Sequence, residues 1–216
     1  MPVNEFVVLT NQYVKGQGLG GIYGIDREWQ LVDGVSRKRS AKGASVSLTR
    51  TPSKKLSDLL VAGPNQFLVG SPAMVKFLAE QKLKNVEFLP LTIFDRRGGE
   101  FTDQYQLIHP IKPVRALDAK KSGASFNEMD RKEVDWVKKL VLLPGKVPAN
   151  VQLFRLANFS LPTIVRRELG ERLAAAFKSV QLVELSAWRN DCLVDPHPNV
   201  TDQIHVSGIS DGFSSL

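Results

Sequence analysis

The chain has 216 residues, of which 43% are hydrophobic, and it carries a net charge of +7. This is enough for a substantial core without a stabilising metal, and the single cysteine, Cys192, excludes an internal disulfide. No apolar run reaches the ~20 residues that a membrane-spanning helix needs, and residues 1–5 lack the pattern of a signal peptide. We therefore expect a soluble, cytoplasmic protein.

The charge is unevenly distributed along the chain. Residues 190–216 contain four aspartates and no Lys or Arg, so residues 1–189 hold all 29 basic residues against 18 of the 22 acidic ones, a net +11. A field of this sign favours an acidic protein surface, nucleic acid or an anionic membrane as partner, and it carries no information about the fold.

The N-terminal segment, residues 1–64, is expected to be rich in β-structure. The apolar run 6–10 predicts a strand, and residues 22–25 and 29–32 predict two short strands separated by turn residues. Residues 36–50 are polar and basic, which is typical of an exposed loop or a sheet edge.

A helix is predicted over residues 53–62. Ser53 is a suitable N-cap, three leucines follow on one side, and Gly63 and Pro64 end the pattern.

A unit of apolar strand, helix and apolar strand occurs twice, with the copies roughly 95 residues apart and matching only in pattern. The two copies are 67–89, with a helix over 72–83, and 164–183, with a helix over 166–177. Each unit has one apolar face, so the two can close a shared core.

The segments around these units have weaker patterns. Residues 105–114 are extended but contain prolines, which predicts a sheet edge or a crossover and not a central strand. Residues 134–143 predict a strand, with helix as the alternative. Residues 190–216 form a polar, acidic tail whose order the sequence leaves open.

Together these elements predict an α+β fold with a mixed β-sheet, a few helices and two related strand-helix-strand units. Residues 65–189 are expected to pack with residues 1–64 as one domain, followed by the tail.

Gly16, Gly18 and Gly21 match the G-x-G-x-x-G pattern of dinucleotide-binding turns. That fingerprint also needs a helix whose N-terminus faces the pyrophosphate, whereas the next residues are strand-like and include Gly24. We interpret the glycines as part of a hairpin or loop.

A metal site or catalysis by histidine has little support in the sequence. Cys192, His197 and His205 lie near aspartates, but no C-x-x-C or H-x-x-x-H spacing is present, so a surface tail with two histidines is the preferred interpretation. We predict no catalytic residues, no cofactor and no metal site.

The basic region Arg37–Lys55 has the electrostatic footprint of a phosphate-binding segment. It contains no recognisable nucleic-acid motif and no aromatic residues among its charges, so a docking surface for an acidic protein is at least as well supported. The alternative for every residue here is an ordinary solvated charge. The candidate partner-binding residues, in this region and around the second unit, are Arg37, Lys38, Arg39, Arg155, Arg166 and Arg167.

Three stretches follow one another in a characteristic order: 105–122, 139–148 and 153–169. With the first strand-helix-strand unit they resemble a family of bacterial immunity proteins, first catalogued in myxobacteria beside polymorphic toxins, over about residues 65–188. The chain departs from the family where His109 replaces a frequent Asn and where Ser179 replaces a usual Gly.

The resemblance implies that the protein neutralises a cognate toxin by direct non-covalent binding and is not an enzyme, and it supplies no catalytic residues. The charge then predicts a toxin with an acidic contact surface. The alternatives are a nucleic-acid or ligand-binding accessory protein that uses Arg37–Lys55, and an enzyme whose site the sequence does not reveal. The toxin's identity and the oligomeric state stay open.

Overall fold

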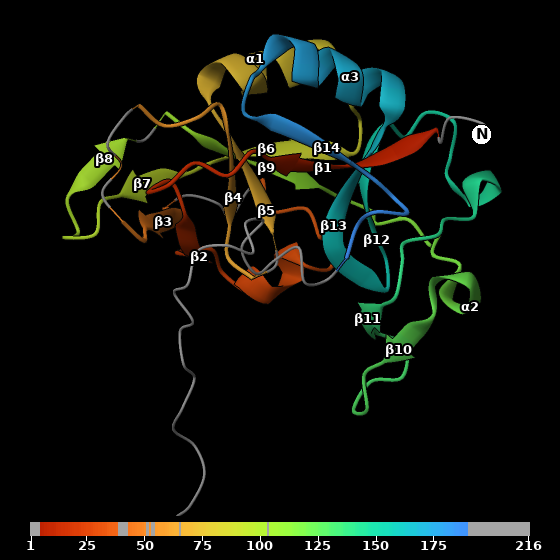
Figure 1. The fold of residues 1–216 in the computed structure, drawn as a ribbon. Helices are drawn as coiled ribbons and strands as arrows, with labels where there is room; N and C mark the ends of the chain where they lie inside the picture. Colours follow the sequence, from red (N-terminus) through yellow and green to blue (C-terminus); the bar gives the residue numbers. More distant parts are fainter. Residues whose placement is uncertain are drawn as a thin grey trace, which may run out of the picture.

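Two sheets, a hairpin and three α-helices make up the described part of the chain in the computed structural model, an α+β fold shown in Figure 1. The structure describes residues 5–38, 43–50, 52, 55–64, 66–102 and 104–189. The four-stranded sheet contains, in order, β12 (Leu153–Leu156), β13 (Phe159–Arg166), β1 (Phe6–Asn11) and β14 (Val180–Glu184). The eight-stranded sheet contains, in order, β6 (Val86–Pro90), β9 (Gln106–Pro110), β5 (Phe67–Gly70), β4 (Leu59–Ala62), β2 (Leu19–Tyr23), β3 (Ser45–Leu48), β7 (Thr92–Phe94) and β8 (Glu100–Thr102). The other elements are the hairpin strands β10 (Ala124–Phe126) and β11 (Val134–Val137), the helices α1 (Pro72–Glu80), α2 (Ala119–Ser122) and α3 (Arg167–Ala176), and short 3-10 helices at Glu28–Leu31 and Pro144–Lys146.

The two predicted strand-helix-strand units share one topology. β5 and β6 both pair antiparallel with β9, which lies between them, and β13 and β14 both pair antiparallel with β1. Each unit is therefore a split β-α-β arrangement, in which the helix connects two parallel strands across an inserted one. The inserted strand has a different origin in each unit. β9 follows its unit in the chain, whereas β1 comes from the N-terminal end and closes the C-terminal unit.

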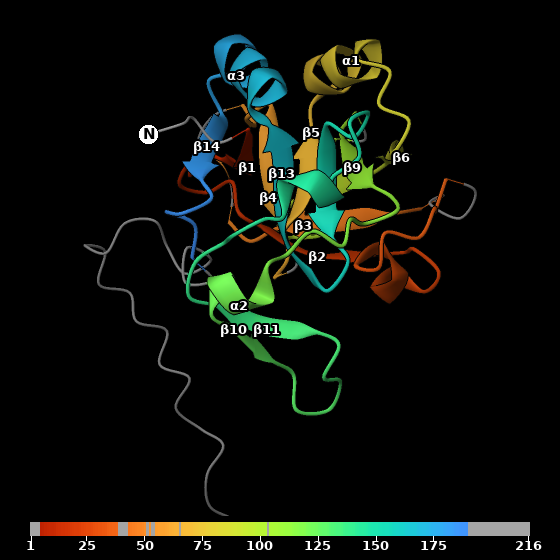
Figure 2. The same cartoon turned by 90° about the vertical axis from the view of Figure 1, so that its right-hand side faces the viewer.

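Helices α1 and α3 lie side by side over the sheets in both views (Figures 1 and 2). Phe77 and Phe177 meet edge to face with ring centroids 5.6 Å apart, and the Arg172 guanidinium lies 5.6 Å from the centre of the Phe77 ring. A single buried cluster joins the two units beneath the helices. Its members include Val7, Leu9, Leu68, Met74, Leu78, Ile108, Val165, Leu169 and Leu173.

Local chemistry explains the bounds of α1. The Ser71 hydroxyl accepts a hydrogen bond from the Met74 backbone N–H at 3.3 Å, and Pro72 occupies the first turn, where no N–H is needed. The helix ends at Glu80, earlier than the predicted residue 83, and Lys82 then adopts a left-handed conformation with φ 54°.

Three predictions for the N-terminal segment are wrong. The predicted helix over 53–62 is instead strand β4 at residues 59–62, because its contiguous apolar residues suit an interior strand that is buried on both faces. Residues 28–31 form a 3-10 helix where a strand was expected. Residues 36–50, predicted to be an exposed loop or a sheet edge, contain β3, an interior strand with Val46 and Leu48 buried.

Two further predictions, for residues 105–114 and 134–143, differ from the structure. β9 is an interior strand and not an edge, because Pro110 stands at its last position, where it interrupts few ladder hydrogen bonds. The strand expected over 134–143 is limited to β11.

The predicted tail, 190–216, lies outside the described residues. No helix in the described ranges is long and apolar enough to cross a bilayer.

Candidate protein-binding surface

Arg37, Lys38 and Arg39 were predicted to contact a partner from one loop. Lys38 is exposed, and Arg39 lies outside the described residues. Arg37 is partly buried, and its backbone N–H donates to Oε2 of Glu87 at 2.9 Å. This anchor and the interior strand β3 show that the basic region Arg37–Lys55 is not one continuous exposed loop.

Arg166 and Arg167 are held in internal contacts at the start of α3. Arg166 forms an ion pair with Glu5 and donates from Nε to the Val151 carbonyl at 3.0 Å. Arg167 donates to both carboxylate oxygens of Glu184, at 2.7 and 2.9 Å. These contacts tie α3 to the strands around it and leave each arginine side chain only 20% exposed.

Arg155, predicted to contact a partner, is buried and so does not lie on the surface of this structure. Its side chain is 2% exposed, its guanidinium lies 4.8 Å from the centre of the Phe67 ring, and its Nη2 donates to the Gln66 carbonyl at 3.1 Å. Burial lowers the pKa of Arg155 to about 10, so the group stays charged at neutral pH. Arg155 therefore links the two sheets from the inside.

His109 lies near this arginine, buried at 1% exposure opposite Glu87 on the neighbouring strand. Its Nε2 lies 2.9 Å from the Val35 carbonyl, so Nε2 carries the proton, and Nδ1 has no hydrogen-bond partner among the described residues. Burial lowers the pKa of His109. The Val35 carbonyl and Glu87 oppose this effect, and the charges of Arg155 and Arg37 add to it.

Acidification is expected to destabilise the protein through His109. Because the pKa of His109 is lower in the folded protein than in the unfolded chain, the unfolded state binds more protons below about pH 6.5. The free energy of unfolding is thus fully retained above that pH and falls as the pH drops below it. Urea unfolding from pH 5 to 8 should show this slope, and His109→Gln should flatten it. An equal slope in the variant would contradict the assignment.

Four exposed lysines from two segments meet beside α2. Lys120 and Lys121 belong to the helix, and Lys138 and Lys139 follow β11. The backbone N–H groups of both later lysines donate to the Ser122 carbonyl, at 3.0 and 3.2 Å, which brings the two pairs together. We call these four residues the α2 lysine cluster. Among the described residues, the ion pair found for this cluster joins Lys121 to Asp118 at 3.6 Å.

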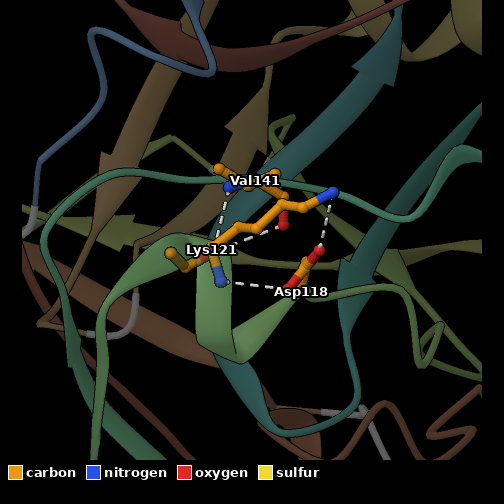
Figure 3. A network of polar contacts seen from close by, with 4 residues as sticks. Asp118, Lys121 and Val141 are labelled. Carbon is orange, nitrogen blue, oxygen red and sulfur yellow. Dashed lines mark hydrogen bonds and ion pairs between the residues drawn. The ribbon is translucent and has the colours of Figure 1, made fainter.

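A polar network fixes the position of the cluster (Figure 3). Asp118 caps α2 by accepting from the Lys121 backbone N–H at 3.0 Å, and its own N–H donates to the Val141 carbonyl at 2.9 Å. The Ser122 hydroxyl accepts from the Val141 N–H at 3.1 Å and donates to the Val141 carbonyl at 3.3 Å. Gly123 then turns the chain with φ 60°. The lysines are therefore displayed from an ordered backbone.

The β10–β11 hairpin extends from the rest of the described chain next to this cluster (Figure 2). We call residues 124–137 the hairpin arm. Three large apolar side chains on it are exposed: Phe126 by 45%, Met129 by 98% and Trp136 by 44%. Val134 and Val137 are buried and hold the arm to the body.

A bulge in β11 explains why Trp136 is exposed although Val134, two residues earlier in the same strand, is buried. Ser125 pairs with Trp136, but Phe126 pairs with Val134, so β11 has one residue more than β10 between these two pairs. Val134 and Val137 therefore face the body, and Trp136 faces outward with Lys138, two residues on. Nothing in the pattern of residues 134–143 predicts this bulge.

The glycine motif builds no nucleotide site in the described residues, and Cys192, His197 and His205 lie outside the described residues. The glycine motif of Gly16, Gly18 and Gly21 leads into strand β2, and no α-helix follows it to face a phosphate. Within the described ranges, no group of three or more His, Cys, Asp or Glu is placed to hold a metal ion. In comparisons with known proteins, the chain matches no protein-family model and no curated protein.

Proposed function

We propose that this protein neutralises a cognate bacterial toxin by direct non-covalent binding, protecting the cell that makes it and its kin. Two things support the proposal: the resemblance of residues 105–122, 139–148 and 153–169 to immunity proteins, and the α2 lysine cluster. The cluster is the observation that carries it, because four exposed lysines lie close together there and, among the described residues, the ion pair found for them is the one between Lys121 and Asp118.

Holding four like charges close together is unfavourable by itself, and it becomes favourable when an acidic surface binds. A positive patch also attracts an acidic partner over a distance of about one Debye length, roughly 8 Å at physiological salt, and so increases the rate of encounter. Rapid capture is what an inhibitor of a toxin needs. The mechanism requires occlusion of the toxin and no covalent step.

The functional test begins with the reading frame next to this gene. If that frame encodes a large secreted protein, its variable C-terminal domain should stop growth when expressed alone in a bacterial host. Growth should recover when this protein is expressed with it, and the purified pair should elute as one complex of fixed stoichiometry. A toxic domain that this protein neither binds nor neutralises would contradict the proposal.

Charge reversal in the α2 lysine cluster is expected to slow association with that toxin domain. Lys120→Glu combined with Lys138→Glu should lower the association rate constant about tenfold or more at low salt, because it removes the attraction to the acidic partner. The wild-type rate should itself fall as salt is added. Stopped-flow mixing at several salt concentrations measures both effects.

The matched control is Lys76→Glu with Lys178→Glu, which changes the net charge equally. Both lysines are exposed, and they lie in α1 and just after α3, on the opposite side of the molecule from α2 (Figure 2). The control should lose much less of the rate. Equal losses in the two double variants would show that net charge acts alone and that the cluster is not the contact surface.

A further inference from the structure

The hairpin arm has an ordered tip. The side-chain Oδ1 of Asn127 accepts the backbone N–H groups of Met129 and Asp130, at 2.8 and 2.9 Å, and the Asn127 N–H donates to the Glu133 carbonyl at 2.9 Å. Asp130 in turn accepts the Lys132 backbone N–H at 3.0 Å. A tip held in this way loses little conformational entropy on binding, so contacts made by its side chains add directly to affinity.

The tip and the outer face of the arm carry the residue types that dominate protein interfaces. Trp and Met are enriched in interface cores, and aromatic side chains bury large areas when they enter a partner. Met129 is almost fully exposed at the tip, and Trp136 is nearly half exposed on the outer face. Phe126 pairs with Val134 and so lies on the opposite face from Trp136, where it borders a hollow that Arg115, Arg131 and other polar residues line.

The charges of the arm distinguish between classes of partner. Residues 124–137 contain four acidic residues and two basic ones, a net charge of −2. A phosphate backbone would be repelled by these carboxylates, although Trp136 beside Lys138 could otherwise stack on a base. A protein avoids this conflict when its acidic groups face the lysines and its apolar recess receives the tip of the arm.

On the basis of the proposed function, we infer that the hairpin arm inserts Met129 and Trp136 into an apolar recess of the toxin, and that the rim of this recess is acidic where it meets the α2 lysine cluster. The lysines speed the encounter and the arm holds the complex. The two parts therefore act on different rate constants: the lysines on association and the arm on dissociation.

The test is Met129→Ser with Trp136→Ser, measured against the same toxin domain by surface plasmon resonance. Losing two anchors should weaken binding about 100-fold or more, mainly through faster dissociation. The control, Tyr13→Ser with Tyr23→Ser, removes two aromatic side chains exposed by 48% and 60% in and near β2 and should bind like wild type. Thermal unfolding should show that both variants are folded.

The outcomes separate this inference from the proposed function. If wild type neutralises the toxin and the arm variant dissociates no faster, the arm is not the anchor, although the immunity function stands. If wild type does not bind the toxin, both ideas fail. Titration with a single-stranded oligonucleotide completes the test: tight binding that Trp136→Ser abolishes would overturn the protein recess in favour of nucleic acid.

Discussion

Val8→Asp should leave the protein unfolded under conditions in which the wild type is fully folded. Val8 is 1% exposed in β1, the strand that pairs with β13 on one side and β14 on the other. A carboxylate buried there without a partner should lower the free energy of unfolding by more than about 4 kcal/mol, which is most of the stability of an ordinary domain. Circular dichroism and urea unfolding measure the loss.

The effect is expected to be global because β1 contributes to two cores. Phe6 and Val8 belong to the buried cluster that also contains Trp188, and Val7 and Leu9 belong to the cluster beneath helices α1 and α3. Loss of this strand would also leave β13 and β14 without the strand that joins them.

Val14→Asp is the matched control for this substitution. Val14 follows β1 by three residues but is 37% exposed, so the same change should alter stability by less than about 1 kcal/mol. If Val8→Asp instead unfolded cooperatively, at a urea concentration near the wild-type midpoint, β1 would not be required to close the second unit.

The sequence allowed the repeated unit to be predicted because its signals are local. The apolar run of β5, the Ser71 cap and the apolar positions of α1 all lie within about 20 residues of one another. The strands inserted into each unit were not predictable in this way. The partner of β13 and β14 lies at the other end of the chain, and the partner of β5 and β6 contains a proline that suggested an edge.

The candidate surface was hidden from the sequence for the same reason. Lys120 and Lys138 are separated by a whole hairpin, and their segments are brought together by the pairing of β10 with β11 and by hydrogen bonds of Asp118 and Ser122 to residues 138–141. The exposure of Trp136 depends on a one-residue bulge, which reverses the face of every later side chain. In contrast, the basic region Arg37–Lys55, which the sequence analysis favoured as a binding surface, contains the interior strand β3.

The burial of Arg155 could not be predicted from the alternation of side chains along β12, because alternation shows which face a side chain is on and not what covers that face. Phe154 and Leu156 face one core cluster, so Arg155 points to the opposite face, which would be solvent if the sheet were open on that side. Here the eight-stranded sheet covers it with Phe67. A buried arginine of this kind should matter for stability and not for recognition.

Arg155→Ala is therefore expected to lower the free energy of unfolding by about 3–5 kcal/mol, because it removes the donor to the Gln66 carbonyl and leaves a cavity beside Phe67. Arg155→Met should cost less than about half of this, since it keeps most of the volume and buries no charge. Urea unfolding provides the comparison. The control is Arg172→Ala, which also removes a guanidinium from a phenylalanine face, but at an exposed position, and should cost about 0.5–1 kcal/mol.

Binding separates the structural role of Arg155 from the contact role first predicted for it. Folded Arg155→Met should bind the toxin domain with wild-type affinity, because the guanidinium never reaches the surface, whereas the lysine and arm variants should fold normally and bind poorly. Weak binding by a fully folded Arg155→Met would mean that the arginine is exposed when the partner docks. The two sheets would then have to separate during recognition, and the rigid surface described for α2 and the arm would be only part of the interface.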